Sequence, residues 1–92
     1  MYSTYPVKDE HPPDKGVIVP HVSIKHFPAS LEEKQREDLV AAVTKAVTDA
    51  FGCADGVVSI AIEPVPEALW NDTVYVPEIV NRRDLLSKIP NY

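Results

Sequence analysis

Within the stretch Val17 to Phe27, hydrophobic and polar residues alternate after Pro20, which is the pattern of a half-buried β-strand. Val22 and Ile24 fall on one face, together with Pro20. The other face carries three polar residues, His21, Ser23 and Lys25. The strand is expected to end at Phe27-Pro28, because proline has no amide proton to donate to a neighbouring strand.

The next segment has helical rather than strand periodicity. Its apolar residues recur at spacings of three and four, which predicts a helix from a cap at Ser30 to about Phe51. The stripe consists of Leu39, Val40, Val43, Ala46, Val47, Ala50 and Phe51. Ser30 followed by Glu33 has the spacing of a capping box, and Gly52 is placed for a left-handed C-terminal cap.

A second alternating stretch, Val57 to Glu63, predicts a second strand, which Pro64 and Pro66 should end. Strand, helix and strand at these lengths predict one βαβ unit with parallel strands, an α/β (α+β) fold. Two strands do not make a stable sheet, so we expect the sheet to join that of a second copy of the chain.

The last third is less regular. It predicts a short helical turn over 66–70 with Pro66 in its first position, a turn over 71–73, and an extended piece over 74–76. A short helix is predicted from Glu78 to Lys88. Residues 1–16 show neither period and predict an N-terminal arm, so the domain itself is expected to span residues 17–92.

Length and charge narrow the functional classes. Ninety-two residues allow one domain, and a net charge of −5 argues against a nucleic-acid or anionic-membrane partner. No apolar run approaches membrane-spanning length, and the single cysteine, Cys53, fits a reducing cytoplasm. Three histidines without a carboxylate or cysteine at ligand spacing do not predict a metal site.

Three stretches together resemble the tautomerase superfamily: Pro20 to Pro28, Leu31 to Gln35, and Ser59 to Ile62. The chain is most similar to the 4-oxalocrotonate tautomerase-like proteins of the dimeric phenylpyruvate-tautomerase type, over about residues 20 to 92. The resemblance implies a βαβ monomer whose sheets join in a four-stranded dimer, sometimes assembled further into a hexamer. It also implies interconversion of the keto and enol forms of a small 2-oxo acid, without a metal or organic cofactor.

The same resemblance implies a catalytic role for Pro20, which matches the amino-terminal proline that serves the family as general base. An α-amine has an ordinary pKa near 7.7–8.0, close to the working pH that proton transfer requires. Candidate substrate-binding residues are Lys25, Ser59, Trp70, Arg82 and Arg83. Trp70 is expected to line the pocket of Pro20, and one of the arginines to hold a carboxylate. The arginines of 4-oxalocrotonate tautomerase itself are replaced by Ala29 or Ser30 and by Ser59.

Residues 1–19 leave two interpretations open, because an internal proline nitrogen is an amide and no base. In the first, translation starts at Val19 from a GTG codon, and removal of the methionine exposes Pro20 as an amine. In the second, the leader is retained, and the chain is a non-catalytic assembly or binding protein on the same fold. A third interpretation keeps the pocket but changes the reaction to hydration, dehalogenation or decarboxylation, because a fold does not fix its chemistry.

Overall fold

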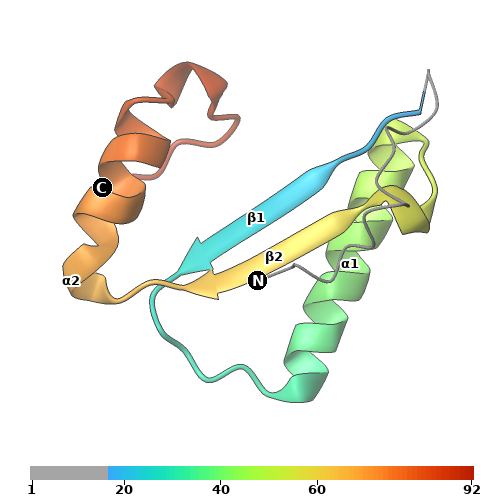
Figure 1. Cartoon of the computed structure of the whole chain (residues 1–92), viewed down its shortest axis with the longest axis horizontal. Coiled ribbons are helices and arrows are strands. Elements are labelled where there is room, and N and C mark those ends of the chain that lie inside the picture. The colour runs from blue at the N-terminus through green and yellow to red at the C-terminus, as the bar shows by residue number, and fades with distance from the viewer. Residues whose placement is uncertain (1–16) are drawn as a thin grey trace, which may run out of the picture.

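The computed structural model describes residues 17–92, and the predicted arm, residues 1–16, lies outside them. Two strands, β1 (His21–His26) and β2 (Ser59–Pro64), lie on either side of the long helix α1 (Glu33–Phe51) in the sequence. After β2 the chain forms the short helix α2 (Glu67–Trp70). Residues 71–92 follow it and are called the C-terminal segment below (Figure 1). The short helical piece η2 (Asp55–Val57) lies between α1 and β2. The C-terminal segment contains η3 (Asn71–Val80) and η4 (Arg83–Leu85).

The two strands confirm the predicted βαβ unit. β1 and β2 pair in parallel, in a register that runs from His21 opposite Ser59 to His26 opposite Pro64. Half-buried side chains alternate with exposed ones over residues 21–24 and 59–62, and the half-buried ones are Val22, Ile24, Ile60 and Ile62. Since α1 lies along one side of the strands (Figure 1), this apolar face is the one that the helix covers. Both strands are shorter at their start than predicted, because residues 17–20 are not paired and Val57 belongs to η2.

Helix α1 ends as predicted but begins differently. Gly52 adopts a left-handed conformation with φ 67°, and its N–H donates to the carbonyl of Thr48 over 2.8 Å. The predicted capping box of Ser30 and Glu33 is wrong by two residues. Glu32 is the cap, and its N–H donates to the side chain of Gln35 over 2.9 Å. A Glu-x-x-Gln box satisfies the same free amides as a serine box, which is why the serine was misleading.

The C-terminal segment differs most from the prediction. Residues 71–80 form one wide helix, η3, instead of a turn and an extended piece, and the helix predicted from Glu78 to Lys88 ends at Val80. Pro77 lies inside η3. Proline lacks an amide proton, and the helix continues with i to i−5 hydrogen bonds such as the one from the Asn81 N–H to the carbonyl of Val76, 2.9 Å long. The helical turn predicted over 66–70 is confirmed, with Pro66 at the cap rather than in the first position.

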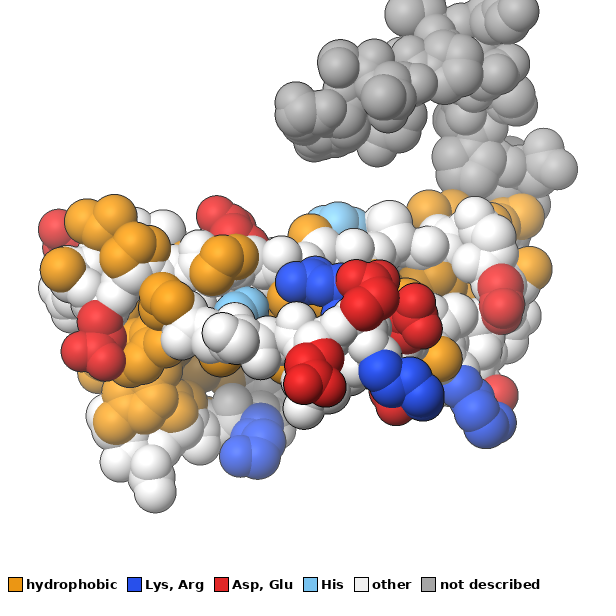
Figure 2. Space-filling view, turned by 90° about the horizontal axis from the view of Figure 1, so that it is seen from below, with side chains coloured by type: hydrophobic (Ala, Val, Ile, Leu, Met, Phe, Trp, Pro, Cys, Tyr) orange, Lys and Arg blue, Asp and Glu red, His pale blue; other side chains and the backbone are white. Residues whose placement is uncertain are grey.

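The chain on its own buries little. Among residues 17–92 only two hydrophobic side chains, Val65 and Val74, are buried, at 3% and 6% exposure. Hydrophobic side chains gather at the left of Figure 2, where Figure 1 places α2 and the C-terminal segment. Exposed apolar surface on this scale is typical of a chain that assembles. No helix among residues 17–92 has the length and apolar character needed to cross a membrane.

Candidate active site

Pro20 directly precedes β1, where the main chain enters the sheet. Its carbonyl accepts a hydrogen bond from the N–H of Ser59 over 3.3 Å, so the first residue of β2 fixes its position. The proline itself is half-buried. Val19 precedes it in the described chain, and the nitrogen of Pro20 is therefore an amide whenever Val19 is present.

His21 and Ser59 form a polar pair beside Pro20. They are opposite each other in the register, and Nδ1 of His21 is hydrogen-bonded to Oγ of Ser59 at 2.7 Å. Both side chains are exposed, on the face of the sheet away from α1. The sequence analysis placed Ser59 at the site but did not pair it with His21. The two residues are paired because the parallel register places them opposite each other, and the sequence of either strand alone does not predict that register.

The opposite end of β1 is apolar. Phe27, directly after the strand, packs edge-on against Trp70, with ring centroids 5.0 Å apart and an interplanar angle of 87°. These two rings and Tyr92 line a cavity of about 490 Å³. The Val65 N–H donates to the carbonyl of His26 over 2.7 Å. This hydrogen bond holds the chain that leads into α2 at this end of the strand.

Trp70 therefore does not line the surroundings of Pro20 within one chain. Pro20 precedes β1 and Trp70 contacts the residue that follows it. At about 3.3 Å per residue, seven residues of extended chain separate the two ends by roughly 20 Å. The prediction that Trp70 lines the pocket of Pro20 therefore requires a contact between two copies of the chain.

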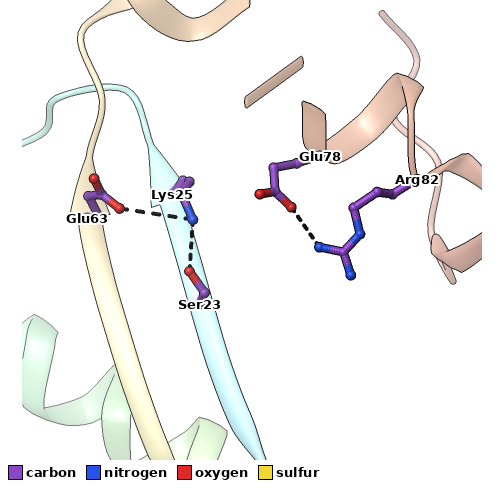
Figure 3. A network of polar contacts seen from close by, with 5 residues as sticks. All are labelled: Ser23, Lys25, Glu63, Glu78 and Arg82. Atoms are coloured by element: carbon purple, nitrogen blue, oxygen red, sulfur yellow. Dashed lines mark hydrogen bonds and ion pairs between the residues drawn. The ribbon is translucent and has the colours of Figure 1, made fainter. Parts of the chain in front are cut away.

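Lys25 borders a second cavity, of about 300 Å³, between β1 and the C-terminal segment. Its Nζ donates to Oγ of Ser23 over 3.1 Å and lies 4.0 Å from Oε1 of Glu63 (Figure 3). The lining residues are Ser23, Lys25, Trp70, Val74, Glu78, Ile79 and Leu86. Lys25 and Trp70, both predicted as substrate-binding residues, thus share one cavity.

The two arginines lie in the C-terminal segment. Arg82 donates to Oε1 of Glu78 over 3.1 Å, and Figure 3 shows this pair facing the Lys25 side chain across a space. Arg83 begins η4 and is exposed. Neither arginine lies at the Pro20 end of β1, because both belong to the segment that follows the far end of the sheet. No group of three histidine, cysteine or acidic residues within 17–92 is placed to hold a metal ion.

Comparison with known proteins defines the class of this fold and site. The sequence profile of the tautomerase enzymes matches residues 20–71, beginning at Pro20. The chain belongs to the tautomerase family and is a tautomerase-like isomerase of the 4-oxalocrotonate type. Proteins of this family are generally oligomeric.

Individual relatives extend the match toward the C-terminus. Tautomerase PptA of Pectobacterium carotovorum subsp. carotovorum (strain PC1) is 32% identical over 74 residues, which cover 80% of this chain and 97% of that protein. Tautomerase PptA of Enterobacter sp. (strain 638) is 35% identical with the same coverage. The protein of that name from Escherichia coli O139:H28 is 31% identical, again over 74 residues.

Proposed function

We propose that this chain interconverts the keto and enol forms of a small 2-oxo acid, with the nitrogen of Pro20 as general base when Pro20 is the first residue. The observation that carries the proposal is the place of Pro20. It stands where the family match begins, half-buried at the start of β1, with its carbonyl held by the Ser59 N–H. The proline ring and this hydrogen bond keep the nitrogen in one position.

The reaction needs no oxidant and no second substrate. The lone pair of the Pro20 amine takes the proton from C3 of the 2-oxo acid, and the electrons of that C–H bond form the C=C bond. The carbonyl π electrons move to oxygen, which accepts a proton from the protonated Pro20 or from water and becomes the enol hydroxyl; in the second case Pro20 releases its proton to water. A positioned base with a pKa near the working pH contributes about 10²–10⁴-fold to such a proton transfer.

We also propose that the site is completed by a second copy of the chain. β1 has an open edge in the two-stranded sheet, and two-fold pairing of this edge with its copy is antiparallel. That pairing sets Pro20 beside the partner copy's Phe27 and Trp70, which gives the amine an apolar wall. It also brings the partner copy's Lys25 toward the base, and Arg82 and Arg83 stay proposals for binding the carboxylate.

The alternative is a non-catalytic assembly or binding protein, which applies to a form that retains the residues before Pro20. The exposed apolar residues Val17, Ile18 and Val19 favour it for that form, because they line or adjoin a cavity of about 420 Å³ at the end of α1. In that form Pro20 is an amide and the proton transfer above has no base.

Two chains that differ by one residue test the base. One begins at Pro20 and the other at Val19, both after removal of the initiating methionine, and both are assayed for enolisation of phenylpyruvate. The proposal expects the chain with Val19 to be at least about 10²-fold less active, since only its proline nitrogen has changed. Equal activity would exclude Pro20 as the base, and absence of activity in both would favour the non-catalytic alternative.

A mixing experiment tests the shared site. One copy begins at Val19 and keeps Trp70, and the other begins at Pro20 and carries Trp70→Ala. Mixed dimers contain one site with a free Pro20 and an intact Trp70 from the other copy, so at substrate concentrations below KM the mixture should exceed the sum of the two separate activities. Activity equal to that sum would place the whole site within one chain.

A further inference from the structure

The polar pair of His21 and Ser59 has no part in the proton transfer described above, although it adjoins the proposed base. His21 follows Pro20 in the chain, and Ser59 donates its N–H to the carbonyl of Pro20. Their side chains are joined at 2.7 Å between Nδ1 and Oγ. The pair is exposed, so a ligand at Pro20 can reach it.

Four cations among residues 17–92 have acidic partners away from Pro20. Lys25 lies five residues further along the strand, about 16 Å from Pro20 at the rise of extended chain, and contacts Ser23 and Glu63. On α1, Lys34 and Lys45 pair with acidic residues one helical turn away, each at 2.8 Å. Arg82 pairs with Glu78 in the C-terminal segment. Within one copy, the described polar side chains bonded at the start of β1 are therefore those of His21 and Ser59.

Ser59 controls which nitrogen of His21 can serve a ligand. A serine hydroxyl can donate or accept, so it can donate to Nδ1 of a neutral imidazole or accept from Nδ1–H of a protonated one. In these two states Nε2 carries the proton and is a donor, whereas in the neutral tautomer that donates from Nδ1 to Ser59 it is an acceptor; an anion at Nε2 favours the first two. None of the hydrogen bonds among residues 17–92 uses Nε2 of His21, and this donor is free for an anion.

We infer that His21, oriented by Ser59, binds the carboxylate of the 2-oxo acid through Nε2–H. This inference rests on the proposed function, because it assigns a partner to the substrate group next to the reacting carbon. The carboxylate of a 2-oxo acid is bonded to C2, and the proton that Pro20 takes is on the neighbouring C3. A donor on the residue after the base therefore fits the short span between the two groups.

The inference is tested by comparing a substrate that has a carboxylate with one in which the carboxylate is esterified and uncharged. Phenylpyruvate and its methyl ester are compared in a chain that begins at Pro20, which keeps every described helix and strand. Its 73 residues are one fewer than the 74 that match 97% of one relative. His21→Leu should lower the preference for acid over ester, measured as the ratio of kcat/KM values, by about tenfold through KM. His21→Gln, whose amide is also a donor, should retain most of the preference.

Two further variants separate positioning from binding. Ser59→Ala should lower the acid preference less than His21→Leu, because the ring loses its orientation but keeps its donor. Lys34→Gln, which removes an exposed cation on α1 that pairs with Asp38, is the matched control and should leave the ratio unchanged. An unchanged ratio in His21→Leu, or an equal or larger loss in Lys34→Gln, would overturn the inference while leaving the proposed function intact.

A binding measurement on the full chain is independent of activity. Phenylacetate, a carboxylate that does not tautomerise in this way, is titrated while the ring signals of His21 are followed by NMR. The inference expects shifts of the His21 signals that saturate, and binding at least about fivefold weaker in His21→Leu. Equal binding in both proteins would overturn it, even if the chain that begins at Pro20 proved inactive and the proposed function failed.

Discussion

The start of β1 is polar and tied by hydrogen bonds between the strands, whereas the far end is apolar and packs against α2. At the start, Pro20, His21 and Ser59 supply a possible base and donors. At the far end, Phe27 and Trp70 supply rings and a cavity with almost no polar lining. A proton-transfer site for an aromatic or aliphatic 2-oxo acid needs both kinds of surface, and one chain holds them about one strand length apart.

This difference explains why the monomer looks incomplete. Neither end encloses a substrate, and twelve large hydrophobic residues among 17–92 are exposed. An antiparallel partner strand would place the polar end of one copy against the apolar end of the other, and do so twice. Assembly and completion of the site then become the same event.

The largest expected effects are on enzyme kinetics: a substitution at the start of β1 should lower kcat, and a substitution at its far end should raise KM. In a chain that begins at residue 20, Pro20→Ala should lower kcat by about 10²-fold, because the secondary amine and its rigid position are lost. Trp70→Ala should instead raise KM by about 10- to 100-fold, the loss of roughly 1.5–3 kcal/mol of apolar contact. Steady-state kinetics with phenylpyruvate measures both. Leu69→Ala, an exposed neighbour that lines neither cavity at Trp70, is the control; a Trp70 effect on kcat alone would contradict the division of roles.

A smaller effect is expected on stability at the end of α1 nearest Val17 and Ile18. Gly52 has φ 67°, and an added Cβ would meet nothing within 4 Å, so Gly52→Ala should cost only backbone strain, about 1–2 kcal/mol. Urea denaturation measures the loss of free energy of unfolding. Gly56→Ala is the matched control, because that glycine also has open space but no positive φ. Equal costs at the two glycines would contradict the left-handed cap.

The beginning of α1 should be less sensitive. Gln35→Ala removes the side-chain half of the capping box with Glu32 and should cost about 0.5–1 kcal/mol of the free energy of unfolding. Arg36→Ala, the next residue on the same exposed stretch of helix, should change it by less than about 0.5 kcal/mol. A larger loss for Arg36→Ala than for Gln35→Ala would mean that the cap does not lie at Glu32.

The smallest effect is expected for the ion pair on the exposed face of the sheet. Lys25 and Glu63 are 4.0 Å apart with side chains 25% and 57% exposed, so Glu63→Gln should change the free energy of unfolding by less than about 0.5 kcal/mol. The change should shrink further when salt is raised to 1 M, where the Debye length is about 3 Å. Ser87→Ala, at an exposed position in the C-terminal segment, serves as a substitution without an ion pair.

The sequence predicts the βαβ unit well because its signals are local. Strand alternation, the apolar stripe that ends at Phe51 and the glycine at 52 each depend on a few neighbouring residues. The C-terminal segment was mispredicted because Pro77 reads as a breaker, whereas η3 accommodates it with a wider hydrogen-bonding pattern.

The site was predicted less completely than the fold, for a spatial reason. Pro20 was found from its place before the strand, but the pairing of His21 with Ser59 depends on the register between strands. Trp70 and Pro20 of one chain lie apart because the length of β1, which no sequence motif reports, sets their separation. Interactions between two copies leave no periodic signal in the sequence of one.

The measurement that tests the central claim most directly is the intact mass of the protein from its source cells, together with its first residue by sequencing. The proposed base requires an active form whose first residue is Pro20, and that first residue, with a mass that lacks residues 1–19, is the result that the account predicts. A mass that includes Val19 and earlier residues in all of the protein would contradict it. Pro20 would then be an amide in the cell, and the non-catalytic alternative would describe the protein.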